Sequence, residues 1–188
     1  MTQICLDLSP YLNAVCASPP LEPGAGVVNA WGNSFPLEEI AFGRRIVLNG
    51  VRFDLPAKKD NGPDHIECLG QCISVSMEAK AGPFEIIHVL GFGELGNQAL
   101  DLTAEDVSGT TVRISVELGN WLRPANEPHR PSAWRASRLR YAAGYDLDFL
   151  QPAITAPAAR LPKAVNMVRL KLGANPLAHV IAVTLSEV

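Results

Sequence analysis

Hydrophobic residues alternate with polar ones along much of the chain, which is the pattern of β-strands. The alternation is most regular over 111–118, as expected for a strand with one face on a core and the other in water. Residues 45–55 predict a β-hairpin, because the central Asn49-Gly50 pair favours a type I′ turn. Further strands are expected at 4–8, 71–77, 84–90, 165–172 and 179–185.

The remaining segments are rich in breakers. We expect irregular structure over 11–43, with one helical turn at Ser34–Glu39, and a loop or short helix over 123–140 that starts near Pro131–Trp134. The 188 residues contain 15 Gly and 15 Pro, which agrees with long connections. About eight strands and no long helix predict an all-β fold, an antiparallel β-sandwich or a barrel, in a single domain spanning 1–188.

Charge and composition exclude several classes of protein. Sixteen basic and 19 acidic residues give a net charge of -3, which argues against a nucleic-acid partner. No apolar run approaches the ~20 residues that cross a bilayer, so no membrane partner is expected. The first residues show no secretory signal, so we predict a reduced, cytoplasmic protein whose four cysteines are small buried hydrophobes.

Two short motifs suggest cofactors or metals but fit them poorly. Gly91–Gly96 matches G-x-G-x-x-G after a strand, but a dinucleotide site needs a following helix, and 97–106 offers at most a few turns. We therefore expect a glycine-rich connection between strands. Three residues separate Cys68 from Cys72, whereas two separate the cysteines of the common zinc knuckle. No cofactor and no metal site are predicted from these motifs.

The four histidines differ in their surroundings. His88 and His179 are in period with apolar neighbours, so we expect both in the core or at a sheet edge. His65 lies in a loop beside Asp64 and Glu67, where exposure to solvent is expected. His129 stands apart, because it belongs to a cationic and aromatic segment.

That segment runs over 120–141 and predicts a ligand site. Five of the 16 basic residues fall within 18 positions, beside Trp121 and Trp134. Arginines next to indole rings bind carboxylates, phosphates and planar groups, so a small, anionic or polar ligand is expected. The alternative, that these arginines pair with acids such as Glu38, Glu39 or Asp106, stays open.

A second polar and aromatic cluster lies at 31–35. Trp31, flanked by Gly32 and Asn33, either presents a stacking platform or folds onto the core; the two alternatives stay open. Phe35 is expected to fold onto the core. Trp31 and Asn33 therefore join the candidate ligand-binding residues.

Several segments together resemble a known family. Asp7–Asn13, Asn33–Glu39, Gly50–Pro56, Asn120-Trp121 and His179–Leu185 are similar to galactose-binding-like β-sandwich modules, which are appended to bacterial, notably actinobacterial, glycoside hydrolases. The resemblance implies a jelly-roll sandwich and binding of carbohydrate. Sandwiches of this type often carry a structural calcium near the chain ends, where Asp7 and Glu187 could supply oxygens or be ordinary surface acids.

Two functions follow from these observations. The first is a stand-alone, cofactor-independent enzyme, a cyclase or isomerase acting on a polyketide or glycosylated natural-product intermediate. The Stig cyclases, which resemble such sandwiches in fold, make this conversion plausible. Trp31, Trp121 and Trp134 would form the walls, His129 the acid/base, and Arg130 or Arg123 the anion holder. The second is a non-catalytic module for a sugar or small ligand. Pairing of sandwich edges leaves a homodimer open.

Overall fold

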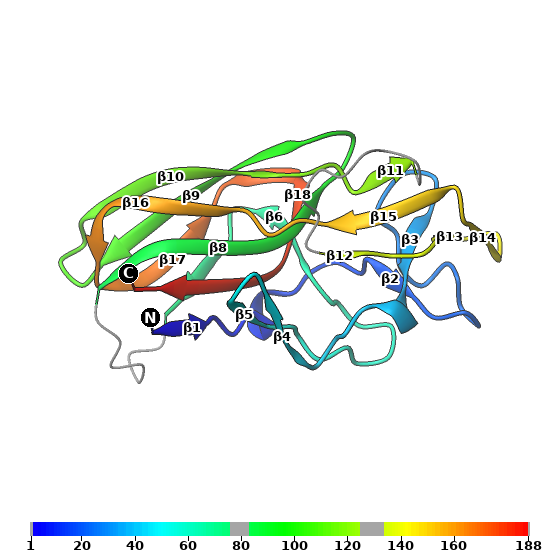
Figure 1. Ribbon diagram of the computed structural model, residues 1–188, viewed down its shortest axis with the longest axis horizontal. Coiled ribbons are helices and arrows are strands. Elements are labelled where there is room, and N and C mark those ends of the chain that lie inside the picture. The colour runs from blue at the N-terminus through cyan, green and yellow to red at the C-terminus, as the bar shows by residue number, and fades with distance from the viewer. Residues whose placement is uncertain (1, 76–82, 125–133, 188) are drawn as a thin grey trace.

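Two large sheets form the left-hand part of the molecule in Figure 1. The computed structural model describes residues 2–75, 83–124 and 134–187. One sheet has the order β1 (Gln3–Cys5), β18 (Ala174–Ser186), β8 (Phe84–Gly93), β16 (Ala158–Val165), with β6 (Ile66–Leu69) also paired to β18. The other has the order β10 (Thr111–Leu118), β9 (Gln98–Asp106), β17 (Met167–Leu172), β7 (Cys72–Ser74). The predicted all-β, antiparallel sandwich is confirmed.

Smaller sheets extend the molecule at the other end of the view (Figure 1). One joins β2 (Ala17–Ser18), β3 (Asn33–Pro36), β13 (Leu139–Tyr141) and β14 (Tyr145–Leu147), and β2 and β3 run parallel. Another joins β11 (Leu122–Pro124), β15 (Leu150–Ile154) and β12 (Trp134–Arg135). β4 (Arg45–Leu48) and β5 (Val51–Asp54) form the predicted hairpin, whose Asn49 and Gly50 have the positive φ of 51° and 78° that a type I′ turn requires.

The pair β8–β18 is buried on both faces over residues 89–93 of β8 and 178–186 of β18. One face packs on a core between the two large sheets, where Ile87 and Val89 of β8 meet residues of β9, β10 and β17. The other face packs on a second core under the smaller sheets, to which β8 contributes Leu90 and Phe92. Strands covered on both sides read as continuous apolar runs, in agreement with the unbroken runs at 89–93 and 180–183.

A β-bulge in β18 directs its side chains to these two cores. Val180 and Val183 both face the first core although they are three residues apart, and the register against β8 shifts between Val180 and Ala182. β8 approaches closely at this point: a Cβ on Gly91 would lie 2.2 Å from the carbonyl oxygen of His179. A glycine is therefore needed at position 91 because there is no room for a side chain beside β18, and this explains Gly91 without a dinucleotide site.

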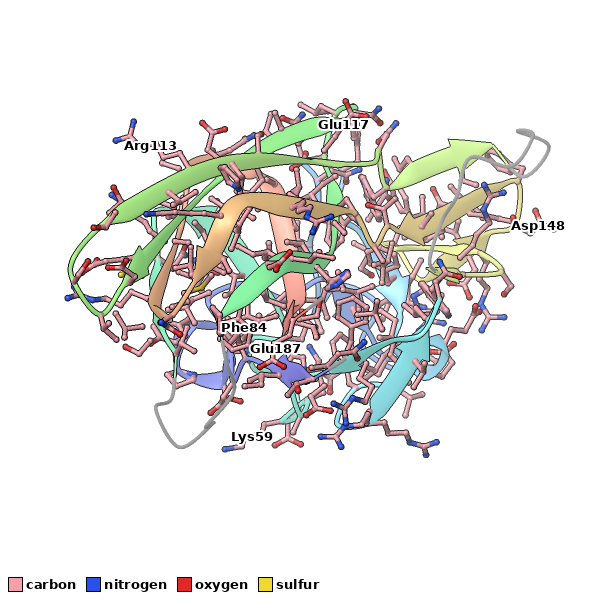
Figure 2. All side chains as sticks on the ribbon, turned by 60° about the vertical axis from the view of Figure 1, so that its left-hand side comes forward. Lys59, Phe84, Arg113, Glu117, Asp148 and Glu187 are labelled. Atoms are coloured by element: carbon pink, nitrogen blue, oxygen red, sulfur yellow. The ribbon has the colours of Figure 1, made fainter. Side chains whose placement is uncertain are left out.

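The G-x-G-x-x-G segment is the expected strand connection. Gly91 and Gly93 end β8, and Leu95 and Gly96 have φ of 57° and 130° in the turn that leads to β9. The alternation predicted over 111–118 is also confirmed in β10, from which Arg113 and Glu117 project outward (Figure 2).

Other expectations were wrong. Trp134 begins strand β12 rather than a helix, and the single turn expected at Ser34–Glu39 is divided between β3 and a 3-10 turn at Leu37–Glu39. Strands β9, β15 and β16 were not predicted. Within the described residues no helix is long and apolar enough to cross a membrane.

Gly91→Ala tests the close approach of β8 to the bulge. The new methyl group would collide with the His179 carbonyl, so we expect a loss of about 3 kcal/mol or more in the free energy of unfolding. Gly24→Ala is the matched control, because its Cβ would meet only a side chain at 3.8 Å and should change stability by less than ~0.5 kcal/mol. Urea denaturation measures both; equal midpoints would contradict the packing described here.

Candidate functional site

A line of ionisable side chains lies between β18 and the loops that precede β6. We call it the histidine chain, and its members in order are Lys58, Asp64, His65, His179 and Glu94. Lys58, Asp64, His65 and His179 are almost completely buried, and the Glu94 side chain is 15% exposed. Burial of this many titratable groups is costly, so their partners decide what the chain can do.

Asp64 anchors the buried end. Its Oδ1 accepts hydrogen bonds from the backbone N–H of Cys16 (2.8 Å) and from Nδ1 of His65 (2.9 Å). Its Oδ2 accepts from Nζ of Lys58 at 2.6 Å and from the backbone N–H of Ala17 at 3.3 Å. Burial by itself raises the pKa of Asp64, but the bonds from His65, Lys58 and Cys16 outweigh it and hold that pKa below its usual range. Asp64 is therefore a carboxylate.

His65 is buried, with only 1% of its side chain exposed, so the prediction of a solvent-exposed His65 was wrong. Its backbone forms a bridge to Ala14, and Asp64 fixes the ring through Nδ1. On the far side, Nε2 of His65 lies 3.0 Å from Nδ1 of His179. These contacts join segments that are 114 residues apart in the sequence.

His179 lies in β18, in the core as predicted. Its ring stacks on Phe92 of the neighbouring strand β8, with centroids 4.6 Å apart and planes at 12°. Burial and then the nearby His65 lower the pKa of His179 to about 3, so the ring is neutral near pH 7. Its Nε2 is buried and has no hydrogen-bond partner in the structure. A charged group lies near this nitrogen: Oε2 of the Glu94 carboxylate is 3.9 Å from Nε2 of His179.

Glu94 closes the chain toward the surface. It follows the end of β8, where its backbone N–H donates to the carbonyl of Leu177. Partial burial, and then the negative charge of Glu67, raise the pKa of Glu94. A carboxyl group with a raised pKa next to a neutral imidazole can both give and take a proton under mild conditions.

Cys16, Asp64 and His65 form the one group of three or more metal-ligating residues in the described part of the chain, with ligand atoms within 4.8 Å of one another. Their chemistry does not fit a metal. Asp64 already accepts four hydrogen bonds, one from the Lys58 ammonium, and burial raises the pKa of the Cys16 thiol well above its usual value. The Cys16 sulfur keeps its proton and the Asp64 oxygens are taken up by hydrogen bonds, so neither is available to a metal ion. Asp7 and Glu187 join no such group among the described residues, and the choice between a calcium site and ordinary surface acids stays open.

Aromatic rings form the floor beneath His179. Phe35 contacts Phe92, Trp121 and Trp134 with centroid distances of 5.1, 5.3 and 5.9 Å. Trp121 is only 1% exposed, and Trp134 is partly buried against the same core. The structure therefore brings two of the predicted walls, Trp121 and Trp134, to the histidine chain through Phe92. Their contact with a substrate stays a prediction.

Trp31 and Asn33, the other described candidate ligand residues, lie outside this cluster. Trp31 is 60% exposed, so it does not fold onto the core, whereas Phe35 does as expected. Asn33 is buried in β3, and its Oδ1 has no hydrogen-bond partner in the structure. His129, Arg130 and the side chain of Arg123 lie outside the described residues, and their roles stay predictions.

Two arginines of the cationic segment are ion-paired, in agreement with the alternative that these arginines pair with acids elsewhere in the chain. The Arg140 guanidinium is buried and donates to both oxygens of Glu38, at 2.7 and 2.9 Å, and to Asp146. Arg138 contacts the same two acids. Hydrogen bonds from Arg140 lower the pKa of Glu38 to about 2, against the smaller opposing effect of burial. These arginines join β13 to the turn after β3 and are not free for a ligand.

Cysteine burial was predicted for all four thiols and holds for two. Cys16 and Cys68 are buried, Cys5 is half-buried and Cys72 is exposed. Cys68 belongs to the first core, whereas Cys72 faces outward.

The fold and this site define a β-sandwich domain with a buried, proton-holding centre. Residues 2–188 match the family model of the AziU2-like beta-sandwich domain, and the chain belongs to that family. The family is associated with natural-product biosynthesis. No curated protein matches the chain.

Sequence reasoning missed the histidine chain, although two signals pointed to it. Asp64 and His65 are adjacent, which is unusual inside a loop that is otherwise punctuated by Gly62 and Pro63. His179 opens an apolar run that continues to Leu185, and a histidine inside such a run must find a polar partner when it is buried. Only the fold shows that the partner is His65.

Lys58→Met tests the buried end of the chain. Loss of the ammonium leaves Asp64 with an uncompensated buried charge, so we expect the free energy of unfolding to fall by about 3 kcal/mol. Lys59→Met is the matched control, since Lys59 extends into solvent at the lower edge of the molecule in Figure 2. Chemical denaturation at pH 7 compares the two. Equal stabilities would show that the Lys58–Asp64 pair is not needed.

Acid stability tests the Arg140–Glu38 pair. The pKa of Glu38 is about 2 in the folded protein and near 4.5 in an unfolded chain, so its contribution is complete above pH 4.5 and is lost as the pH falls toward 2. We expect Arg140→Gln to reduce the slope of unfolding free energy against pH in that interval. An unchanged slope, measured by urea titration at several pH values, would contradict the assignment.

Proposed function

We propose that this protein is a cofactor-independent enzyme of natural-product biosynthesis, a cyclase or isomerase that works by proton transfer on a small intermediate. One observation carries the proposal: Nε2 of His179 is buried without a partner, at the end of a hydrogen-bonded line of titratable groups. Apolar residues would fill the same space at lower cost, and perturbed groups of this kind concentrate in active sites.

The surroundings of the chain favour a hydrophobic or glycosylated substrate. Phe92, Phe35, Trp121 and Trp134 pack into one aromatic cluster that reaches His179. Such rings hold a folded, apolar intermediate while an adjacent acid/base group moves a proton. His129 as acid/base and Arg130 or Arg123 as anion holder remain part of the proposal. The free thiols of all four cysteines support a reducing, cytoplasmic compartment.

A carbohydrate-binding module is the second candidate. Trp31 and Tyr145 are 60% and 51% exposed, and Tyr145 stacks on Tyr141 with centroids 4.9 Å apart. The loop of Trp31 packs against this turn, because a Cβ on Gly32 would lie 2.9 Å from Cβ of Ala142. Exposed aromatic faces on neighbouring loops are suited to stacking on a sugar ring, in agreement with the galactose-binding-like resemblance.

Metabolite profiling of the host organism tests the enzyme. A cofactor-free cyclisation or isomerisation neither adds nor removes atoms, so loss of activity should accumulate an intermediate with the elemental composition of the product. We expect His179→Gln to lower the product on the order of a hundredfold, and His129→Ala combined with Arg130→Ala to do the same. Liquid chromatography with mass spectrometry separates the two isomers.

His88→Gln is the matched control, because His88 is a partly buried histidine of β8 whose Nε2 lies 3.0 Å from the Ser186 hydroxyl, away from the histidine chain. Its strain should keep the wild-type profile. Wild-type profiles in both the His179 and the His129/Arg130 strains would overturn the proposal that the protein is an enzyme. If Trp31→Ala then abolished retention on immobilised oligosaccharides while the equally exposed Phe149→Ala did not, the binding module would replace it.

A further inference from the structure

We infer that the histidine chain is a proton relay, which takes a proton at Glu94 near the surface and stores it on His65 beside Asp64. Its use in a reaction rests on the proposed function, in which Glu94 would exchange the proton with the substrate. The relay itself is a property of this chain and can be tested without a substrate.

The hydrogen bonds fix where the protons sit before one is added. Asp64 is a carboxylate and only accepts, so Nδ1 of His65 carries a hydrogen. If His65 is neutral, its Nε2 is bare and must accept from Nδ1–H of His179. A neutral His179 then has a bare Nε2. Two acceptors, this nitrogen and the Glu94 carboxylate, face each other and cannot bond, which explains the 3.9 Å separation and the unpartnered atom.

Addition of one proton resolves this conflict. A proton taken by Glu94 makes its O–H a donor to Nε2 of His179. Transfer then breaks the Glu94 O–H bond and forms Nε2–H, while Nδ1–H of His179 breaks and Nε2–H of His65 forms. Glu94 is again an anion, His179 is neutral in its other tautomer, and His65 is an imidazolium held by Asp64. Every proton that leaves one atom arrives at the next.

Charge favours a stored proton. The charged groups around the two rings are Asp64, which is paired with Lys58, at one end and Glu94, which lies near the charge of Glu67, at the other, and the buried Cys16 thiol keeps its proton. Within the chain itself, two carboxylates and one ammonium leave a net charge of -1 around two neutral imidazoles. One added proton makes the chain neutral, which a low-dielectric interior prefers.

Geometry requires only a small movement. The gap between Glu94 and His179 exceeds a normal hydrogen bond by about 1 Å. Glu94 lies at the end of β8 and is partly exposed, so rotation of its side chain can close the gap on one side and reach solvent or substrate on the other. His179 cannot move in the same way, because it is stacked on Phe92 and bonded to His65.

Long-range ¹H–¹⁵N NMR of the full chain, labelled with ¹⁵N-histidine, tests the relay between pH 4.5 and 8.5. As the pH falls, we expect His179 to change from the Nδ1–H to the Nε2–H tautomer without becoming doubly protonated, while His65 gains a second proton at the same midpoint. Spectra of His179→Gln and His88→Gln assign the signals. A His179 that keeps one tautomer throughout, or titrates apart from His65, would overturn the relay.

Glu94→Gln tests the outer end. Without the carboxylate that accepts Nε2–H, the midpoint of the tautomer change should fall by about one pH unit, a tenfold loss of proton affinity. Glu85→Gln, on strand β8 and paired with the exposed Arg160, should leave the midpoint unchanged. Equal midpoints in the two variants would show that Glu94 is not part of the relay. If the wild-type protein shows the tautomer change while the metabolite profiles of the His179 and His129/Arg130 variant strains stay wild type, the proposed function is rejected and the relay remains.

Discussion

The burial of residues 89–93 of β8 and 178–186 of β18 on both faces is the constraint on which the rest of the structure depends. A strand pair covered on one side only could place a histidine toward water. Here both sides are apolar, one against the second large sheet and one against the smaller sheets, so His179 has nowhere polar to point except toward another buried group. The bulge in β18 and the missing side chain of Gly91 bring the strand into the register that aims this ring at His65.

The histidine chain is held by the fold from both of its ends. Asp64 ties the loop before β6 to the backbone at Cys16 and Ala17, and the same carboxylate orients His65. Glu94 is placed by the turn that follows β8, a turn in which Gly96 takes a positive φ of 130°. One set of residues thus serves both packing and proton chemistry, which is why the arrangement is rigid at His179 and adjustable only at Glu94.

The sequence predicts what is local. Strand β10 and the β4–β5 hairpin follow from alternation and from Asn49-Gly50, both of which act within a few residues. Strands β15 and β16 escape prediction because Pro152 and Pro162 lie inside them and their alanines weaken the alternation of apolar and polar residues. The burial of His65 depends on β18, so no window around residue 65 contains the cause. Of the candidate site, Trp121 and Trp134 were found from composition, whereas the histidine chain needed the tertiary fold.

Strand β18 pairs with β1, β6 and β8, and those contacts reach across nearly the whole sequence. Neither core can close until this strand has docked. The entropy of closing a loop of nearly the whole chain is therefore lost before most of the apolar area is buried. Folding of such a topology is slow, in the millisecond-to-second range typical of all-β proteins with distant pairings. During that time the apolar edges of β8 stay open to other chains, and the protein's yield in the cell depends on how quickly β18 finds its place.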